Sequence, residues 1–384
     1  MFVWARALRA DSPLLALPVL AALSLATGCN EAETDTGPTT TTTTGPDLSC
    51  ENAGSQSDGE PPAPAEDADA PAAGELVFAV SKFYLGALDF DGKPSSSAWK
   101  ELGFNLDRTV SVEQGGCVCQ PAAGGKASHL EDAPLGRDNS YGNNLVPMLS
   151  TLSSEFESDT NAAVGTGKHT WLFQLPGVGS DNSYSGLSGA AFEGATLTDA
   201  QGQPAAPVLD GSDVWPLAGE SFAEGDPMTP RLVFEDAYVI PRDDGGILWV
   251  GYGKGSIRLR ASYPGDDLRG TIHDPVVVLP ISPDRTRIER GMLGGTLVTE
   301  ELVIEIGRVF GFFEYNGESL CPPSSAFESI AQQVRQASDM LPGGAVDPGS
   351  TCDRISIGIA FDAVPAALGD IVAPQPLTDP CAAP

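Results

Sequence analysis

Oxygen-rich residues in two short loops offer the first candidate chemistry, the binding of a hard cation. Calcium takes several oxygen ligands from carboxylates, amides and carbonyls on a bending loop. The segments "LDFDGK", "NLD" and "GRDNSYGNN" carry such oxygens, although none has the twelve-residue calcium-loop pattern. The alternative is plain turn chemistry, because Asp-Gly and Asn-Ser are common where a chain reverses. The candidate calcium ligands are Asp89, Asp91, Asp107, Asp138 and Asn139.

Histidine-based catalysis has little support in the sequence. The chain holds only His129, His169 and His273, and it lacks both a Gly-x-Ser-x-Gly nucleophile motif and a His-Glu-x-x-His zinc motif. Carboxylate pairs could hydrolyse a glycosidic bond. The chain has 52 acidic residues, however, so abundance alone guarantees such pairs and none can be preferred. We therefore assign no catalytic residue.

Residues 250–256, "VGYGKGS", resemble a phosphate-binding loop only in composition. Such a loop opens a helix whose N-terminus holds the phosphate, and its lysine precedes Ser or Thr. Here Lys254 precedes a glycine, and the glycines lie between two strand-like segments, 246–253 and 256–262. We therefore predict a hairpin turn at 253–255 that joins two strands.

Cys29 is the candidate for lipid attachment. Arg6 and Arg9 precede an apolar run over 14–26, which suits a signal peptide and is too short to span a bilayer. The run ends in "ATGC", which resembles a bacterial lipobox and implies cleavage before Cys29 and acylation there, for example by palmitate. Residues 1–28 are then a signal peptide, and the mature protein is anchored in the cell envelope, with the outer membrane favoured. The alternative is an ordinary secretory signal.

The remaining cysteines predict disulfides. Seven cysteines less Cys29 leave an even number, which is typical of a disulfide framework in an oxidising compartment. Cys117 and Cys119 are separated by one residue, so each is expected to pair elsewhere. Cys321 and Cys352 bracket a predicted helix, and we predict a bond between them. The full set is Cys50, Cys117, Cys119, Cys321, Cys352 and Cys381.

Residues 29–74 predict a tether between the lipid and a folded domain. After Cys29 this segment has Leu48 as its single large apolar residue among Thr, Pro, Gly, Ala and acids. Such a composition cannot bury enough apolar area to offset the entropy of ordering. We therefore predict a single β-rich globular domain over 75–384.

Strand-like segments dominate the predicted domain. "ELVFAV" from Glu75, residues 231–240, "TIHDPVVVLPI" and "GGTLVTEELVIEIG" have strand character. In "DRISIGIAFDA" the apolar residues alternate at Ile355, Ile357, Ile359 and Phe361. The pattern predicts a mainly β fold of β-sandwich-like character, with α+β as the alternative.

Two amphipathic helices are expected to pack on the sheet. Residues 324–341 place apolar side chains on one face, and Ser325 with Glu328 matches a capping box. Residues 144–160 space Leu145, Leu149 and Phe156 at helical intervals. Both apolar faces are interpreted as parts of the core.

Three segments resemble landmarks of a family of secreted lipoproteins from myxobacteria and their relatives. They are "AWKELGFNLD", "GRDNSYGNN" and "CDRISIGIAFDA", and the resemblance covers most of residues 75–381. Family members tend to carry Asp-Gly just before the GxDNS segment, where this chain has "EDAPLG". The family is uncharacterised, so the resemblance implies kinship and no chemistry.

The charge balance limits the possible partners. The formal net charge is −31, which repels nucleic acid and anionic lipid head groups. We therefore expect a membrane contact through the lipid, no nucleic acid, and a protein or glycan partner. The predicted function is that of a cell-envelope lipoprotein that presents a disulfide-stapled domain for binding or for a structural role. The alternative is an envelope hydrolase acting on glycan or another extracellular polymer.

Overall fold

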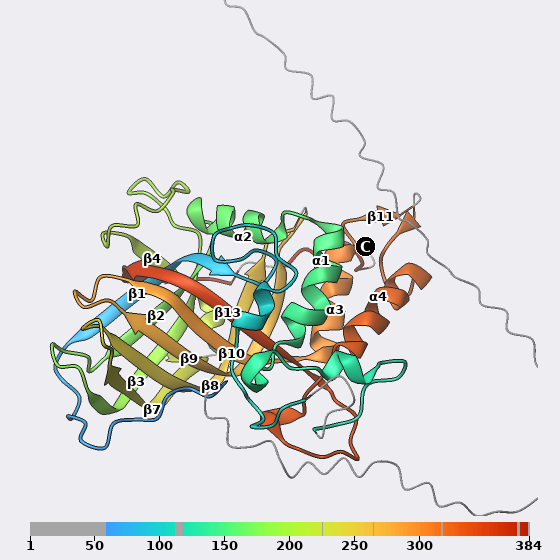
Figure 1. The fold of residues 1–384 in the computed structure, drawn as a ribbon. Helices are drawn as coiled ribbons and strands as arrows, with labels where there is room; N and C mark the ends of the chain where they lie inside the picture. The colour runs from blue at the N-terminus through green and yellow to red at the C-terminus, as the bar shows by residue number, and fades with distance from the viewer. Residues whose placement is uncertain are drawn as a thin grey trace, which may run out of the picture. The chain divides into compact units, whose positions relative to one another are not determined.

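Ten strands, the predicted ones among them, join into one sheet (Figure 1). Along the sheet the strand order is β14-β4-β3-β2-β1-β13-β10-β9-β8-β7. The bounds are β1 (Glu75–Tyr84), β2 (Thr170–Pro176), β3 (Tyr184–Gly194), β4 (Val214–Ala218), β7 (Leu232–Pro241), β8 (Ile247–Ala261), β9 (Leu268–Ile281), β10 (Ile288–Val298), β13 (Arg354–Pro365) and β14 (Ala367–Val372). Two small hairpins pair β5 (Phe222–Ala223) with β6 (Asp226–Pro230), and β11 (Glu314–Tyr315) with β12 (Glu318–Ser319).

The computed structural model describes residues 59–111, 118–224, 226–263, 265–315, 318–374 and 377–382. The predicted signal peptide, Cys29, Cys50 and Cys117 lie outside these ranges. None of the helices within them has the length and apolar character needed to cross a bilayer. The mainly β fold with helices packed on the sheet is confirmed.

The sheet closes on itself through β3. Ala190 of β3 lies opposite Gln174 of β2 on one side and opposite Val233 of β7 on the other. The strands β3, β2, β1, β13, β10, β9, β8 and β7 therefore form a closed antiparallel ring. Closure satisfies the backbone donors and acceptors that an open edge would leave unpaired.

Aromatic and branched side chains fill the inside of this ring. Phe173 stacks on Phe361 with ring centroids 5.2 Å apart, and Phe234 meets Trp249 edge-on at the same distance. The predicted alternation in β13 is confirmed, because its isoleucines and Phe361 are all fully buried. Burial of each such side chain stabilises the folded state by about 1.5–3 kcal/mol, as an upper estimate.

The outer face of β13 is buried too, because a loop packs directly against it. Position 358 must be glycine, because a Cβ there would lie 2.5 Å from the backbone nitrogen of Gly103. Gly103 itself has a φ of +95°, a conformation that favours glycine. This contact holds the loop after Trp99 against the sheet.

Four helices cover one side and one end of the sheet (Figure 1). They are α1 (Val146–Leu152), α2 (Phe156–Gly165), α3 (Thr299–Phe310) and α4 (Ser325–Gln336). Helix α2 packs on β1 and β8, and α3 packs on α4, β9 and β10. Single turns of 3-10 helix lie at Ala98–Glu101, Ala127–Leu130, Pro134–Gly136, Gly219–Ser221 and Pro342–Gly344, and a π-helical turn lies at Tyr141–Leu145.

Two helix predictions and one strand prediction need correction. The stripe over 144–160 is divided between α1 and α2, with a break at Ser153, whose backbone is extended. The segment over 294–307, predicted as strand, is strand only up to Val298, and the rest belongs to α3, because its apolar side chains cover one helical face. Helix α4 ends at Gln336, before the predicted 341, and its N-cap is Ser324, whose hydroxyl accepts the backbone N–H of Phe327 at 3.2 Å. The predicted Ser325–Glu328 box is not used.

The predicted hairpin at 253–255 is wrong. Strand β8 runs without a turn from Ile247 to Ala261 and pairs with β9 on both sides of this segment. The glycines instead allow a local bulge within this strand. A short glycine motif is compatible with either a bulge or a turn, because both use backbone conformations that glycine adopts easily.

The predicted Cys321–Cys352 disulfide is also wrong. Cys352 bonds to Cys119 and Cys321 bonds to Cys381, with Cα atoms 5.3 Å and 5.4 Å apart. Backbone hydrogen bonds between Gln120 and both Ser350 and Cys352 bring the two segments together. Contacts between distant segments, and not closeness in sequence, therefore decide the pairing.

Packed chain begins before the predicted boundary at Glu75. The carbonyl of Gly59 accepts the N–H of Asn105 at 2.8 Å. The N–H of Ala72 donates to the carbonyl of Gly177 at 2.8 Å, and the N–H of Asp69 donates to that of Ser183 at 3.2 Å. Residues 59–74 therefore lie against the domain.

Candidate ligand-binding groove

Three neighbouring strands, β8, β9 and β10, are irregular at the same level of the sheet, and the β9–β10 register shifts between Gly294 and Thr296. The β8–β9 register moves from Tyr252↔Val276 to Ser256↔His273, which leaves one extra residue in β8. Gly255 has a φ of +109°, and a Cβ there would lie 1.8 Å from a backbone oxygen. Asp274 in β9 also has a positive φ, of 44°. Bulges of this kind redirect side chains and are frequent beside binding sites.

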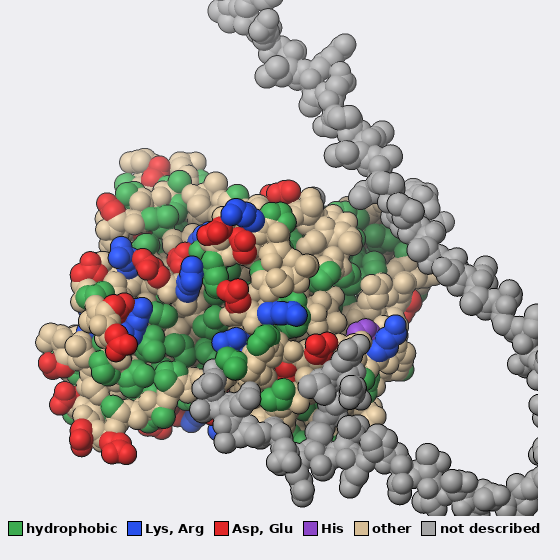
Figure 2. Space-filling view, viewed as in Figure 1, with side chains coloured by type: hydrophobic (Ala, Val, Ile, Leu, Met, Phe, Trp, Pro, Cys, Tyr) green, Lys and Arg blue, Asp and Glu red, His purple; other side chains and the backbone are tan. Residues whose placement is uncertain are grey.

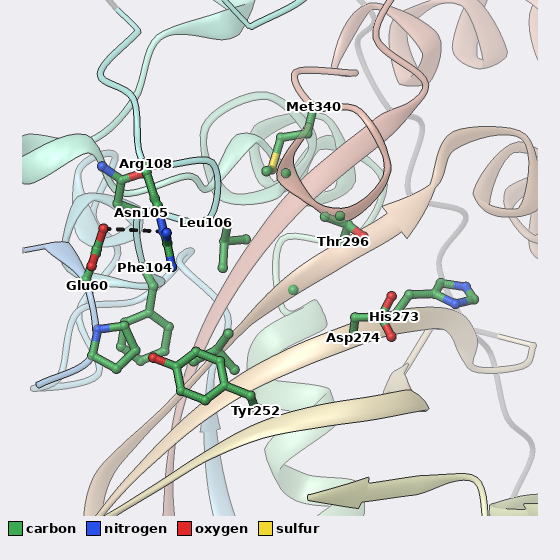
Figure 3. A pocket seen from close by; sticks show the side chains of 15 residues that line it. Glu60, Phe104, Asn105, Leu106, Arg108, Tyr252, His273, Asp274, Thr296 and Met340 are labelled. Carbon is green, nitrogen blue, oxygen red and sulfur yellow. Dashed lines mark ion pairs between the residues drawn. The ribbon is translucent and has the colours of Figure 1, made fainter. Parts of the chain in front are cut away.

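The irregular strands form the floor of a groove of about 260 Å3 (Figure 3). One wall is the loop over 104–108 together with Glu60 and Pro61. The other wall is the segment over 340–344 that follows α4. The lining residues are Glu60, Pro61, Phe104, Asn105, Leu106, Arg108, Tyr252, His273, Asp274, Val276, Gly295, Thr296, Met340, Gly343 and Gly344.

Two aromatic rings give the groove an apolar surface. Phe104 is nearly buried and packs with Tyr238, Val250 and Val278 on the outer face of the sheet. Tyr252 is 48% exposed, which is unusual for a large aromatic residue in the middle of a paired strand. Figure 3 shows its ring across the floor of the groove, next to Phe104. A ligand that covers Tyr252 would remove this apolar area from water.

Charged and polar groups surround the rings. Glu60 and Arg108 form an ion pair at 3.8 Å on one wall (Figure 3). On the opposite side His273 Nε2 lies 3.5 Å from Glu301 Oε2, and the Asp274 carboxylate accepts the N–H of Gly255 at 3.4 Å. The groove thus combines an apolar platform with hydrogen-bond donors and acceptors on two sides, as ligand sites commonly do.

A ridge of apolar side chains continues from the groove along the outer face of the sheet. Ile240, Leu248, Val276 and Met292 are partly buried against the cluster that includes Phe104. Figure 2 shows hydrophobic side chains gathered over the strands, with acidic side chains around them. Apolar surface bordered by polar residues is typical of an interaction surface.

Buried carboxyl groups lie behind the wall that holds Phe104. Asp138 accepts the N–H of Leu106 at 2.6 Å, Asp132 accepts that of Ser111 at 2.6 Å, and Asp107 accepts the N–H of Thr109 at 2.7 Å. Asp339, next to Met340 in the chain, accepts both the N–H and the hydroxyl of Ser356. These bonds fix the loop segments that form the groove walls.

Burial raises the pKa of each of these acids. The pKa of Asp132 rises to about 8, first through burial and then through the charges of Asp107 and Asp339. Burial raises the pKa of Asp339 to about 7, although its Ser356 bonds oppose the rise. The pKa values of Asp138 and Asp107 are raised as well, with burial as the largest cause. Asp132 therefore holds its proton at neutral pH, and Asp339 titrates close to it.

The structure divides the predicted calcium ligands. Asp107 and Asp138 meet near Asp132 and Asp339, which sequence reasoning missed because they come from separate segments. Asp89 and Asp91 line a different cavity, where Asp89 accepts the backbone N–H groups of Asp91 and Lys93 in a turn.

The Asn139 amide is already used, because it accepts from Gly142 and Gly358 and donates to Trp99. Among the described residues, no group of three or more His, Cys, Asp or Glu side chains is arranged to hold a metal ion. The five-residue site is therefore not formed.

The histidines take three different places. His129 Nδ1 accepts the N–H of Lys126 at the start of a 3-10 turn. His169 is buried, burial lowers its pKa to about 3, and its Nε2 has no hydrogen-bond partner within the described part of the chain. Only His273 lines the groove.

Comparison with known proteins returned no relative: no protein-family model, curated protein or solved structure matches the chain. The resemblance to secreted myxobacterial lipoproteins therefore stays a prediction, and the case for a function rests on the groove.

Proposed function

We propose that this chain is a lipid-anchored protein of the cell envelope that binds a short stretch of glycan. The observation that carries the proposal is the half-exposed Tyr252 ring at the centre of a groove with polar walls. The lipobox-like motif at Cys29 supports the anchor, and the geometry of the groove supports the binding site.

A glycan suits this groove for a chemical reason. A sugar ring has an apolar C–H face, which packs on an aromatic ring such as Tyr252 or Phe104. Its hydroxyl groups need donors and acceptors at the edges, and Asp274, Thr296 and Arg108 supply them. A volume of about 260 Å3 is small for a ligand pocket, so we expect a short segment of a longer chain to bind.

The proposed anchor and the groove are compatible in distance. Residues 30–58 separate Cys29 from the first described residue, Gly59. These 29 residues can span at most about 100 Å when fully extended. Envelope polymers within that distance of the membrane would be accessible to the groove.

Isothermal titration calorimetry on the purified mature protein tests the proposal. The probes are β-1,4-linked N-acetylglucosamine tetramer and maltotetraose, which separate two linkage types. We expect saturable binding of one of them and a loss of about threefold to tenfold in affinity for Tyr252→Ala, the usual contribution of an aromatic contact. Tyr252→Phe keeps the ring and should bind as the unmodified protein does.

Met228→Ala provides a matched control, because Met228 is 83% exposed and does not line the groove. If neither oligosaccharide binds, or if Tyr252→Ala binds as well as the unmodified protein, the glycan proposal fails. Release of new reducing ends during the titration would instead favour the predicted alternative, an envelope hydrolase.

A further inference from the structure

A second cavity lies on the outward face of β8, away from the bulge. Arg258 and Arg260 project outward there, because Ile257, Leu259 and Ala261 are buried in the core, as the alternation in this segment predicts. The cavity has a volume of about 80 Å3. Its charged lining consists of Lys168, Arg258, Arg260, Arg269, Glu193 and Glu220.

This lining runs against the composition of the chain. Acidic residues outnumber lysine and arginine by 52 to 21 overall, whereas cations outnumber carboxylates in the cavity. An excess of one sign of charge in a cavity with low-dielectric walls attracts an ion of the opposite sign. The cavity is therefore a local exception on a strongly acidic protein.

Most of the cations already have a carboxylate partner. Arg258 Nε lies 2.8 Å from Glu193 Oε1, and its Nη2 lies 3.8 Å from Glu220 Oε1. Lys168 Nζ and Arg260 Nη2 share Asp267, at 2.7 Å and 2.8 Å. The Asp267 side chain is fully buried and supplies one negative charge to these two cations.

Arg269 is different, because within the described part of the chain it forms no ion pair. Its Nε is buried and has no hydrogen-bond partner there. The nearby carboxylates Asp266 and Glu305 are each bound to Arg308, both at 2.6 Å. Burial, followed by the charges of Arg260 and its neighbours, lowers the pKa of Arg269, as expected for a cation that lacks a counter-ion.

We propose that this cavity binds a single tetrahedral oxyanion of the phosphate class, with Arg269 as the principal ligand. A guanidinium fork matches the oxygens of such an anion, and the bond is charge-assisted at both ends. The small volume admits one such group, either as free phosphate or as the terminal phosphate of a lipid. The proposal is independent of the glycan groove, which uses other residues.

Calorimetric titrations of the full mature protein at constant ionic strength test this site. The probes are inorganic phosphate, inorganic sulfate and dihexanoyl phosphatidic acid, a soluble short-chain lipid. We expect one saturable site for phosphate and a rise in melting temperature relative to chloride. Arg269→Gln should weaken phosphate binding by about tenfold or more, the usual effect of losing a charge-assisted hydrogen bond.

Arg287→Gln makes the same change in charge at an exposed surface ion pair and should leave phosphate binding unchanged. Arg269→Lys keeps the charge without the fork, so it should bind more weakly than the unmodified protein even if Arg269→Gln does not fold. Tighter binding of the lipid than of inorganic phosphate would identify a lipid head group as the source. Absence of saturable phosphate binding, or equal binding by both Arg269 variants and the unmodified protein, would overturn the proposal.

Discussion

At the residue scale, buried carboxyl groups link the groove walls to pH. Asp132 and Asp339 have pKa values of about 8 and about 7 in the folded protein, against 3.8 in the unfolded chain. The folded state therefore holds these protons more tightly than the unfolded state does. Their contribution to stability is complete below pH 3.8 and is lost as the pH rises through 7 to 8.

We therefore predict that the melting temperature falls between pH 5 and pH 9. From pH 5 up to its folded-state pKa, each of the two groups lowers the free energy of unfolding by about 1.4 kcal/mol per pH unit, and above that pKa it causes no further change. Asp132→Asn removes one such proton and keeps an oxygen that can accept the N–H of Ser111, so it should flatten the profile. The exposed Asp243→Asn is the control and should leave the profile unchanged. A melting temperature that rises from pH 5 to pH 9 would contradict the prediction.

At the element scale, helix α4 shows how neighbouring residues with similar chemistry compete for one role. Ser324 and Ser325 are both good N-cap residues. The extended backbone of Ser324 directs its hydroxyl to the N–H of Phe327, whereas Ser325 lies inside the first turn.

We predict that Ser324→Ala lowers the free energy of unfolding by about 1 kcal/mol, because an orphan backbone donor of α4 loses its acceptor. Ser325→Ala should change it by a few tenths of a kcal/mol, since alanine is well suited to the first turn. Urea denaturation of the two variants and of the unmodified protein measures both changes. A larger loss for Ser325→Ala than for Ser324→Ala would contradict the observed cap.

The disulfides are also a feature of the elements that they join. Cys321 and Cys381 are 60 residues apart, so their bond ties the start of α4 to the end of the described chain. We predict that mass spectrometry of unreduced proteolytic fragments finds Cys321 linked to Cys381, and Cys119 linked to Cys352. Replacing Cys321 and Cys381 together by serine should cost about 4 kcal/mol on the chain-entropy model. A fragment that links Cys321 to Cys352 would refute this pairing.

At the scale of the whole molecule, the sequence predicts what depends on local pattern. The alternation of apolar residues in β13 was predicted correctly, because every second side chain of this strand points into the ring. The bulge in β8 could not be foreseen, since pairing with β9 decides whether Gly253 and Gly255 form a turn or stay within a strand. The strand prediction for the α3 segment is wrong for a related reason. Its branched residues favour strands, but their spacing also suits a helix.

The groove was beyond the reach of sequence reasoning. Phe104, Tyr252 and Met340 come from segments that are far apart in the chain, and no local spacing connects them. The available signal was a tyrosine flanked by glycines in "VGYGKGS", which the sequence interpretation assigned to a turn. Tertiary packing alone brings these side chains together.

The proposed anchor is tested on the whole chain. Cys29→Ser removes the thiol that the lipid would modify, so we predict that the protein leaves the membrane fraction or accumulates as the unprocessed precursor. Cell fractionation with immunoblotting measures this distribution, and Asn30→Ser is the control with an intact Cys29. Processed protein that stays in the membrane fraction after Cys29→Ser would contradict the prediction.

The entry point of the chain into the domain has a mechanical consequence. Gly59 is bonded to Asn105, and Glu60 and Asn105 both line the groove. A pull between the proposed anchor and a polymer held in the groove would therefore be applied at nearly the same place on the domain. The load would pass between the short segment around Gly59 and the strands that form the groove floor, so the other strands of the closed sheet would carry little of it when the protein holds its ligand under tension.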